Sequence, residues 1–157
     1  MVNGTTMRPR VVYTTTGNAN GVAVSVLNGK TTLYLPDTGV SVFKPVSKKD
    51  PYEDRALYAL DVSPEGGYLS NKRLLNNPIT YFYDGIRVSR NGWIFAGSGD
   101  GIDVIDPKSG LALGSIRVGG GENVAVSLAF GEHELWIVGR GGVWHVSDIE
   151  ERLDREW

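Results

Sequence analysis

The chain has 157 residues, enough for about one domain with a sizeable core, and its 41% hydrophobic and 22% charged residues are ordinary for a globular protein. The formal net charge of −2 gives no electrostatic reason to expect nucleic acid or an anionic membrane as a partner. The lack of cysteine excludes disulfides, thiolate metal sites and a cysteine nucleophile. Since there is no signal peptide and no membrane-spanning apolar run, we expect a soluble protein, cytoplasmic if Met1 is the true start, although the sequence leaves the compartment open.

Short apolar runs separated by turn residues fill the first half of the chain, a pattern typical of antiparallel strands. Residues 8–15 predict a lone strand. Asn28-Gly29 predicts a tight hairpin. The strands of this first unit are expected at residues 22–27, 31–35, 56–62 and 69–75. Residues 40–43 are a weaker candidate for the third strand. Residues 44–55 are polar with two prolines and are interpreted as an inserted surface loop.

A second and a third unit follow with the same organisation. The second is expected to have strands at residues 86–89, 93–96, 102–106 and 111–118. The third is expected to have strands at residues 124–130, 135–138 and 143–148, and no fourth strand. Ile149 to Trp157 is charged, and we expect it to form one short helix with Asp148 as its N-cap.

The three units open in a similar way, with a polar residue before an alternating strand. The openings are Asn20-Gly21, Asp84-Gly85 and, more weakly, Glu122-Asn123. The spacing of about 40 residues between the last two openings is the length of a four-stranded propeller blade. We therefore predict an all-β fold, a β-propeller fragment of about three four-stranded blades. The blades are expected at residues 17–80, 81–120 and 121–148, with a short tail at 149–157.

Three blades do not close a ring, since propellers have typically 4–8 blades. The chain therefore resembles the second half of a six-bladed propeller, as a fragment, a truncated product or one of two assembled halves. A half-ring exposes apolar blade faces, which favours self-association.

The order of these motifs resembles the senescence-marker-protein/gluconolactonase (regucalcin-like) family, and its fungal lactonase-like members in particular. The likeness covers most of residues 8–148. The matching stretches are Asn20-Gly21, residues 69–73, Asp84-Gly85-Ile86, Asn91-Gly92-Trp93-Ile94 and residues 97–104. The resemblance implies a six-bladed propeller that hydrolyses a sugar-type lactone with one divalent metal ion in its central channel. A small-molecule lactone is then the expected substrate, with no nucleic acid or membrane as partner.

The resemblance also implies roles for two residues. Asn20 and Asp84 match the family's metal-binding asparagine and aspartate, and Asp84 matches the residue that acts as the catalytic base. Ca²⁺ is the expected ion, with Mg²⁺, Mn²⁺ or Zn²⁺ as alternatives, and no organic cofactor is expected. A glutamate from the first blade of the family has no counterpart in this chain. Whether the chain is itself an enzyme is therefore left open.

Other interpretations stay open beside this one. Asp-Gly and Asn-Gly are common turn pairs, so a purely structural role fits both openings. A non-catalytic binding or interaction module is the alternative function, because propellers also serve as platforms. Asp100, Asp103 and Asp106 are interpreted as surface carboxylates on a strand. The two histidines lack zinc spacing, and Trp93, Trp136 and Trp144 are expected in the core.

Overall fold

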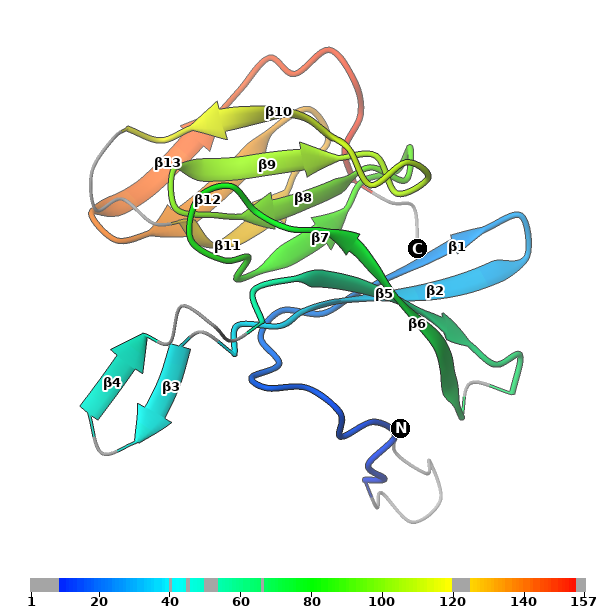
Figure 1. The fold of residues 1–157 in the computed structure, drawn as a ribbon. Helices are drawn as coiled ribbons and strands as arrows, with labels where there is room; N and C mark the ends of the chain where they lie inside the picture. The colour runs from blue at the N-terminus through cyan, green and yellow to red at the C-terminus, as the bar shows by residue number, and fades with distance from the viewer. Residues whose placement is uncertain are drawn as a thin grey trace.

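Three antiparallel sheets in a row form most of the molecule, and a fourth, two-stranded sheet projects from the first (Figure 1). The computed structural model describes residues 9–39, 41–44, 46–49, 54–65, 67–119 and 125–154. None of these residues lies in a helix, and so no helix in this part of the chain could cross a membrane. The expected all-β class is confirmed.

The first sheet has the strand order β1-β2-β5-β6. Its strands are β1 (Ala23–Leu27), β2 (Lys30–Pro36), β5 (Leu57–Val62) and β6 (Leu69–Asn76). Leu27 pairs with Lys30, and the two residues between them both have positive φ, 51° at Asn28 and 75° at Gly29. This is the turn that an Asn-Gly pair predicts, because both central residues of such a hairpin need positive φ.

The second and third sheets repeat the meander with shorter connections. The second contains β7 (Ile86–Val88), β8 (Ile94–Gly97), β9 (Gly101–Ile105) and β10 (Ala112–Arg117). The third contains β11 (Ala125–Phe130), β12 (Leu135–Gly139) and β13 (Gly142–Val146). The described residues add no fourth strand to the third sheet.

Two apolar clusters hold the three sheets together. The first cluster joins the first and second sheets, and the second cluster joins the second and third sheets. The fully buried members include Leu57, Ile86 and Ile94 in the first cluster and Ile102, Leu135 and Ile137 in the second cluster. Each such side chain contributes about 1.5–3 kcal/mol on burial. The second sheet contributes residues to both clusters and therefore lies between the other two.

The insertion in the first unit is not only a loop. Residues in it form a two-stranded hairpin of β3 (Ser41–Lys44) and β4 (Val46–Lys49), seen at the lower left of Figure 1. The prediction that Lys44 to Arg55 is a surface loop is therefore wrong over the hairpin. β5, not residues 40–43, is the third strand of the sheet, as expected.

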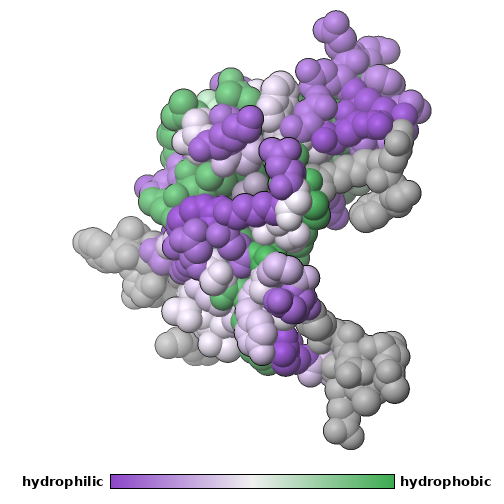
Figure 2. All heavy atoms as spheres, turned by 90° about the vertical axis from the view of Figure 1, so that its right-hand side faces the viewer, coloured by the Kyte–Doolittle hydropathy of each residue, from purple (hydrophilic) through white to green (hydrophobic). Residues whose placement is uncertain are grey.

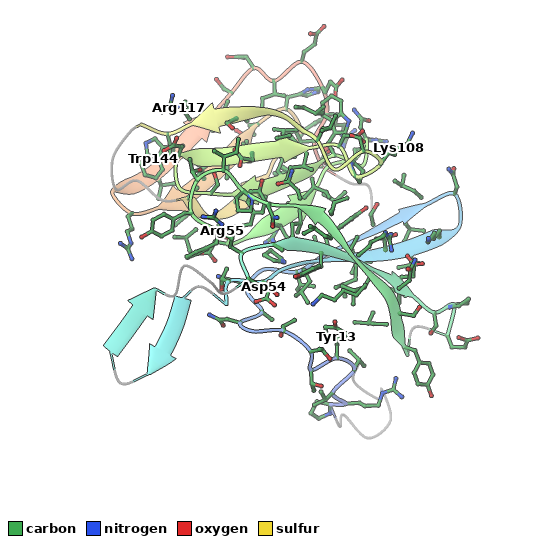
Figure 3. The ribbon with its side chains drawn as sticks, in the orientation of Figure 1. Tyr13, Asp54, Arg55, Lys108, Arg117 and Trp144 are labelled. Atoms are coloured by element: carbon green, nitrogen blue, oxygen red, sulfur yellow. The ribbon has the colours of Figure 1, made fainter. Side chains whose placement is uncertain are left out.

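The N-terminal segment does not form the predicted strand. Residues 10–16 have no strand, and they contact the first sheet through side chains instead. Arg10 donates a hydrogen bond to the carbonyl oxygen of Gly67, and Lys72 donates one of 3.3 Å to that of Thr15. Tyr13 lies on this segment (Figure 3). Apolar and polar residues alternate in this segment as in a strand, but residues 10–16 pair with no strand of the described part of the chain.

The described part of the C-terminal segment, residues 149–154, is not the predicted helix either. Asp148 has a φ of 57°, which is not the geometry of a helix N-cap. The N–H of Ile149 and the N–H of Leu153 donate hydrogen bonds to the turn after β11, at His133 (3.1 Å) and Glu132 (2.9 Å). Leu153 is buried in the second cluster. Tertiary contacts therefore determine this segment, and local helix propensity does not.

Candidate metal and active site

Asn20 and Asp84 occupy equivalent places in neighbouring sheets, just before the first strand of each. The N–H of Asn20 donates a 3.2 Å hydrogen bond to the carbonyl oxygen of Pro36, the last residue of β2. The N–H of Asp84 donates a 2.9 Å hydrogen bond to the carbonyl oxygen of Gly97, the last residue of β8. Each residue is thus fixed against the end of the second strand in its own sheet.

The glycines after these two residues bring the sheets into backbone contact. A Cβ atom on Gly21 would lie 2.4 Å from the carbonyl oxygen of Asp84, and one on Gly85 would lie 2.6 Å from that of Val126. Gly85 also donates a 2.8 Å hydrogen bond from its N–H to the Val126 carbonyl. Neither glycine has positive φ, so turn geometry does not explain them. Close approach does, which weakens the interpretation of both pairs as simple turns.

This backbone contact brings Asn20 and Asp84 close enough for their side chains to interact. Burial of the Asp84 carboxyl group raises its pKa, and the hydrogen bond with the Asn20 side chain partly opposes this rise. A carboxylate only accepts hydrogen bonds, so the amide nitrogen of Asn20 is the donor. The amide oxygen of Asn20 is then left for another partner.

The chemistry of this pair suits a hard cation. Carboxylate and amide oxygens are the donors that Ca²⁺, Mg²⁺ and Mn²⁺ prefer. In the part of the chain that the structure describes, no three His, Asp or Glu side chains form a group that could hold an ion. The donor types of the pair suit a divalent ion, but the described residues supply at most part of a coordination shell.

In the described part of the third sheet, the residue at the corresponding contact is apolar. Gly85 contacts Val126 just as Gly21 contacts Asp84, so Val126 is the structural counterpart of Asp84. Its side chain is apolar. The predicted third opening, Glu122-Asn123, lies outside the described residues.

The three aspartates of the β9 region are bonded locally. Asp103 accepts a 2.5 Å hydrogen bond from Ser115, and Asp100 forms an ion pair of 3.5 Å with Arg117. Asp106 accepts bonds from the backbone N–H groups of Lys108 (3.0 Å) and Ser109 (3.3 Å), and so stabilises a turn. Their positions match the interpretation as carboxylates of a strand and its turn, although all three are half-buried.

The aromatic residues only partly follow the expectation of core positions. Trp144 packs against the second cluster, whereas Trp93 and Trp136 are 37% and 42% exposed. Trp136 stacks on the ring of His145 at 4.1 Å between centroids, and His145 Nε2 lies 2.6 Å from a carboxylate oxygen of Glu134. This group lies on the outer face of the third sheet because strand alternation directs only Leu135 and Ile137 inward.

One residue of the site was missed in the sequence. Asp37 is only 1% exposed, and its carboxylate accepts hydrogen bonds from three backbone N–H groups, those of Gly17 (2.9 Å), Asn18 (2.9 Å) and Gly39 (3.1 Å). The stretch Pro36 to Gly39 predicts only a chain break. An Asp two residues before a Gly is a signal for a local side-chain-to-backbone bond, but it does not predict the contact with Gly17 and Asn18.

Comparison with known proteins identifies relatives that share part of this chain. The lactonohydrolase oryH of Aspergillus oryzae is 36% identical over 138 residues, which cover 79% of the chain and 28% of that protein. No family model matches the sequence.

Solved structures agree with this relationship. A gluconolactonase from Xanthomonas campestris matches with 27% identity and a TM-score of 0.63, over 82% of this chain and 37% of its own. A calcium-binding regucalcin from Agrobacterium tumefaciens matches in fold, with 18% identity and a TM-score of 0.63, over 87% of this chain and 48% of its own. The chain thus spans less than half the length of each of these proteins.

Proposed function

The chain is related to the regucalcin-like lactonases over part of their length, and from this relationship we propose that it is the metal-binding part of a propeller that hydrolyses a sugar-type lactone. The observation that carries the proposal is the pairing of Asn20 with Asp84 at the starts of two adjacent sheets. This pairing supports the proposal because the resemblance selects both residues, although 64 positions separate them in the printed numbering.

The three sheets would be consecutive blades of a six-bladed ring. Their strand orders are those of antiparallel meanders, and the starts of β1, β7 and β11 lie together, as inner strands of a propeller do. The blades would occupy residues 17–80, 81–120 and 121–148. The segment 149–154 would be a packed extension of the third blade, since it bonds to the turn of that sheet.

A divalent ion, with Ca²⁺ first among the candidates, would be held by the Asn20 amide oxygen and an Asp84 carboxylate oxygen. When bound, such an ion polarises a lactone carbonyl and lowers the pKa of water. Asp84 would accept a proton from the attacking water, and its raised pKa makes its carboxylate a better base than an exposed aspartate. Ca²⁺ takes about 6–8 oxygen ligands, so water, substrate and the rest of the ring would supply most of them.

Hydrolysis of a sugar lactone such as a gluconolactone, followed by acid release at constant pH, tests this function directly. We expect Ca²⁺-dependent hydrolysis from the complete six-bladed ring, loss of activity with a chelator, and a loss of at least about 100-fold in Asp84→Asn, because the base is removed and a charged ligand oxygen becomes a neutral one. Asp106→Asn, a change in a turn carboxylate of the second sheet, is the matched control. Equal rates in Asp84→Asn and the control would contradict the proposal.

A second candidate, an interaction module, rests on the outer face of the third sheet. Trp136, Val138 and Val143 are 42%, 47% and 64% exposed, and cross-strand pairing puts all three on one face. On the side of the molecule that is drawn in Figure 2, other hydrophobic residues also lie at the surface among hydrophilic ones. We propose that this face meets a second copy of the chain. Because the chain aligns with 48% of a regucalcin, two copies would carry about as many sheets as one relative.

A further inference from the structure

The four residues that lead to β1 are bonded to the end of β2 one after another. Gly17 and Asn18 donate from their N–H groups to the Asp37 carboxylate. Thr38 donates to the carbonyl oxygen of Asn18 twice, from its N–H at 2.9 Å and from its Oγ1 at 3.0 Å. Ala19 forms a β-bridge with Asp37, and Asn20 donates to Pro36.

The carboxylate of Asp37 is fully used in these bonds. Oδ1 accepts from Asn18 and Gly39, Oδ2 accepts from Gly17, and the side chain is buried. A carboxylate occupied by three backbone donors and closed off from solvent is not available to an ion or a substrate. Asp37 therefore supports the site, because its two oxygens accept hydrogen bonds from the loop before Asn20 and from Gly39.

Asp37 also lies at the neck of the inserted hairpin. Its N–H donates a 2.8 Å hydrogen bond to the carbonyl oxygen of Ala56, where the chain returns to the sheet. Gly39 is where the chain leaves the sheet, and a Cβ atom on it would lie 3.3 Å from the carbonyl oxygen of Asp54, which is labelled in Figure 3. The buried carboxylate of Asp37 thus bonds both to the loop before Asn20 and to Gly39, where the inserted hairpin begins. These bonds oppose a displacement of the loop by movement of the hairpin.

We propose that Asp37 is a positioning residue that fixes the loop 17–20 so that the amide of Asn20 stays beside Asp84. The inference rests on the proposed metal site, because it gives Asn20 its role. In Asp37→Asn one amide oxygen remains as acceptor for the three N–H groups of Gly17, Asn18 and Gly39, and an NH2 group replaces the other oxygen. The loop 17–20 is then held less firmly against the end of β2, and the amide of Asn20 shifts relative to Asp84.

The experiment compares Asp37→Asn with Asp106→Asn in the chain as it exists. Asp106 is the matched control because it also accepts backbone N–H bonds after a strand, but in the turn after β9. Two quantities are measured: the Ca²⁺ dissociation constant by calorimetry, and the NMR signal of the Asn20 side-chain amide, assigned by its loss in Asn20→Ala. We expect Asp37→Asn to weaken Ca²⁺ binding about 10–100-fold, as changes that misorient metal ligands do. The Asn20 amide signal should shift as well, and the control should change neither quantity.

The two readouts separate the possible failures. If the unmodified chain binds no Ca²⁺, the proposed metal site fails, and the Asn20 amide signal still tests the positioning role. If Asp37→Asn folds and leaves both the amide signal and Ca²⁺ binding unchanged, the positioning role is wrong. If Asp37→Asn does not fold, Thr38→Val, which removes only the Oγ1 bond to Asn18, is used in its place. A folded Thr38→Val with no shift of the Asn20 amide would overturn the inference.

Discussion

The Cα atom of Gly21 lies so close to Asp84 that a Cβ atom there would be only 2.4 Å from the Asp84 carbonyl oxygen. The obstacle is a backbone atom, which cannot rotate away as a side chain can. We expect Gly21→Ala to separate the first sheet from the second and to destabilise the protein by about 1–3 kcal/mol, as overpacked sites do. Because the same shift moves Asn20 from Asp84, Ca²⁺ binding should weaken as well.

Chemical unfolding with and without Ca²⁺ measures both effects. Gly114→Ala is the control, since a Cβ atom at Gly114 meets nothing within 4 Å. If Gly21→Ala and Gly114→Ala were equally stable, the close approach of the two sheets would have no energetic importance.

We expect ionised Asp84 to destabilise the fold in the absence of metal and to stabilise it when Ca²⁺ is bound. Burial raises its pKa, which means that the ionised form is disfavoured in the folded state. A group with a raised pKa favours folding below its unfolded pKa, and this contribution is lost as the pH rises through the folded pKa. At pH 7, Asp84→Asn should therefore melt at a higher temperature than the unmodified chain when no metal is present.

Added Ca²⁺ should reverse that order. Binding to the folded state adds about 2.7 kcal/mol of stability at 100 times the dissociation constant, and Asp84→Asn, which binds Ca²⁺ more weakly, should gain less at the same Ca²⁺ concentration. Thermal melts at pH 7 with a chelator or with Ca²⁺ test both parts. If Asp84→Asn melted at a lower temperature than the unmodified chain in the absence of metal, ionised Asp84 would stabilise the fold, and the prediction would be wrong.

The sequence predicted the repeated parts of the fold well, because local patterns determine them. Asn28-Gly29 specifies its hairpin by the φ values it permits, and alternating apolar residues gave eleven strands in three sheets. The segments at both ends were mispredicted because contacts distant in sequence determine them. Arg10 bonds to Gly67, and Leu153 bonds to Glu132.

The candidate site divides in the same way. Repetition in the sequence selected Asn20 and Asp84, but the contact between them depends on how two sheets approach. Asp37 could not be selected, because its partners Gly17 and Asn18 lie about 20 positions away and nothing in a turn-like Pro-Asp-Thr-Gly indicates them.

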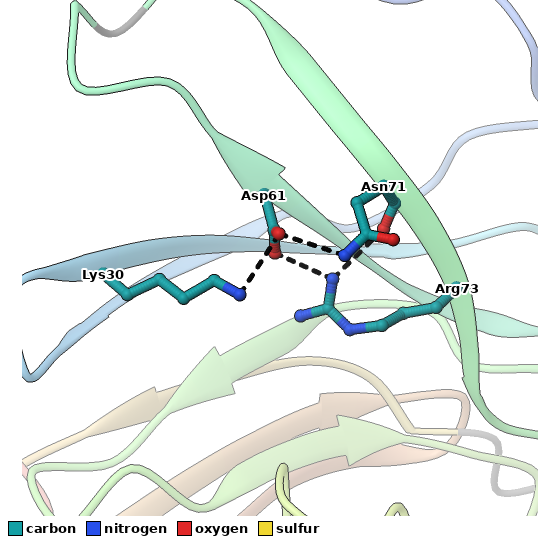
Figure 4. Close-up of polar contacts among 4 residues, drawn as sticks. All are labelled: Lys30, Asp61, Asn71 and Arg73. Carbon is teal, nitrogen blue, oxygen red and sulfur yellow. Dashed lines mark hydrogen bonds and ion pairs between the residues drawn. The ribbon is translucent and has the colours of Figure 1, made fainter.

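Asp61 connects three strands of the first sheet through a polar network (Figure 4). Asn71 and Arg73 donate hydrogen bonds to its carboxylate, and Lys30 lies 3.1 Å from it. These contacts, led by the bond from Asn71, lower the pKa of Asp61 from 3.8 to about 2. A lowered pKa stabilises the fold above the unfolded pKa, and the contribution is lost as the pH falls through the folded value.

Asp61→Asn should therefore flatten the fall in stability between about pH 4 and pH 2. Because Lys30 and Arg73 are exposed, solvent screening limits the effect at pH 7 to about 1 kcal/mol or less. Unfolding free energies measured across this pH range, with Glu65→Gln as an exposed control, check it. An Asp61→Asn profile that fell as steeply as that of the unmodified chain would show that the network has no net effect on stability.

The outer face of the third sheet gives the prediction on assembly. Val138 pairs with Val143, and Trp136 pairs with His145, so one face presents three apolar side chains beside the Glu134–His145 contact. Burying apolar surface of this kind stabilises a contact by about 25 cal/mol for each Å² that is removed from water.

We expect the unmodified chain to sediment as a dimer at micromolar concentrations. Val143→Lys should shift it to the monomer, since a buried charge without a partner opposes the contact. Leu113→Lys changes an equally exposed apolar residue on β10, an outer strand of the second sheet, and should leave the dimer intact. A dimer that survives Val143→Lys would place the interface elsewhere, whereas a monomer at every concentration would leave the lactonase proposal standing without a partner copy.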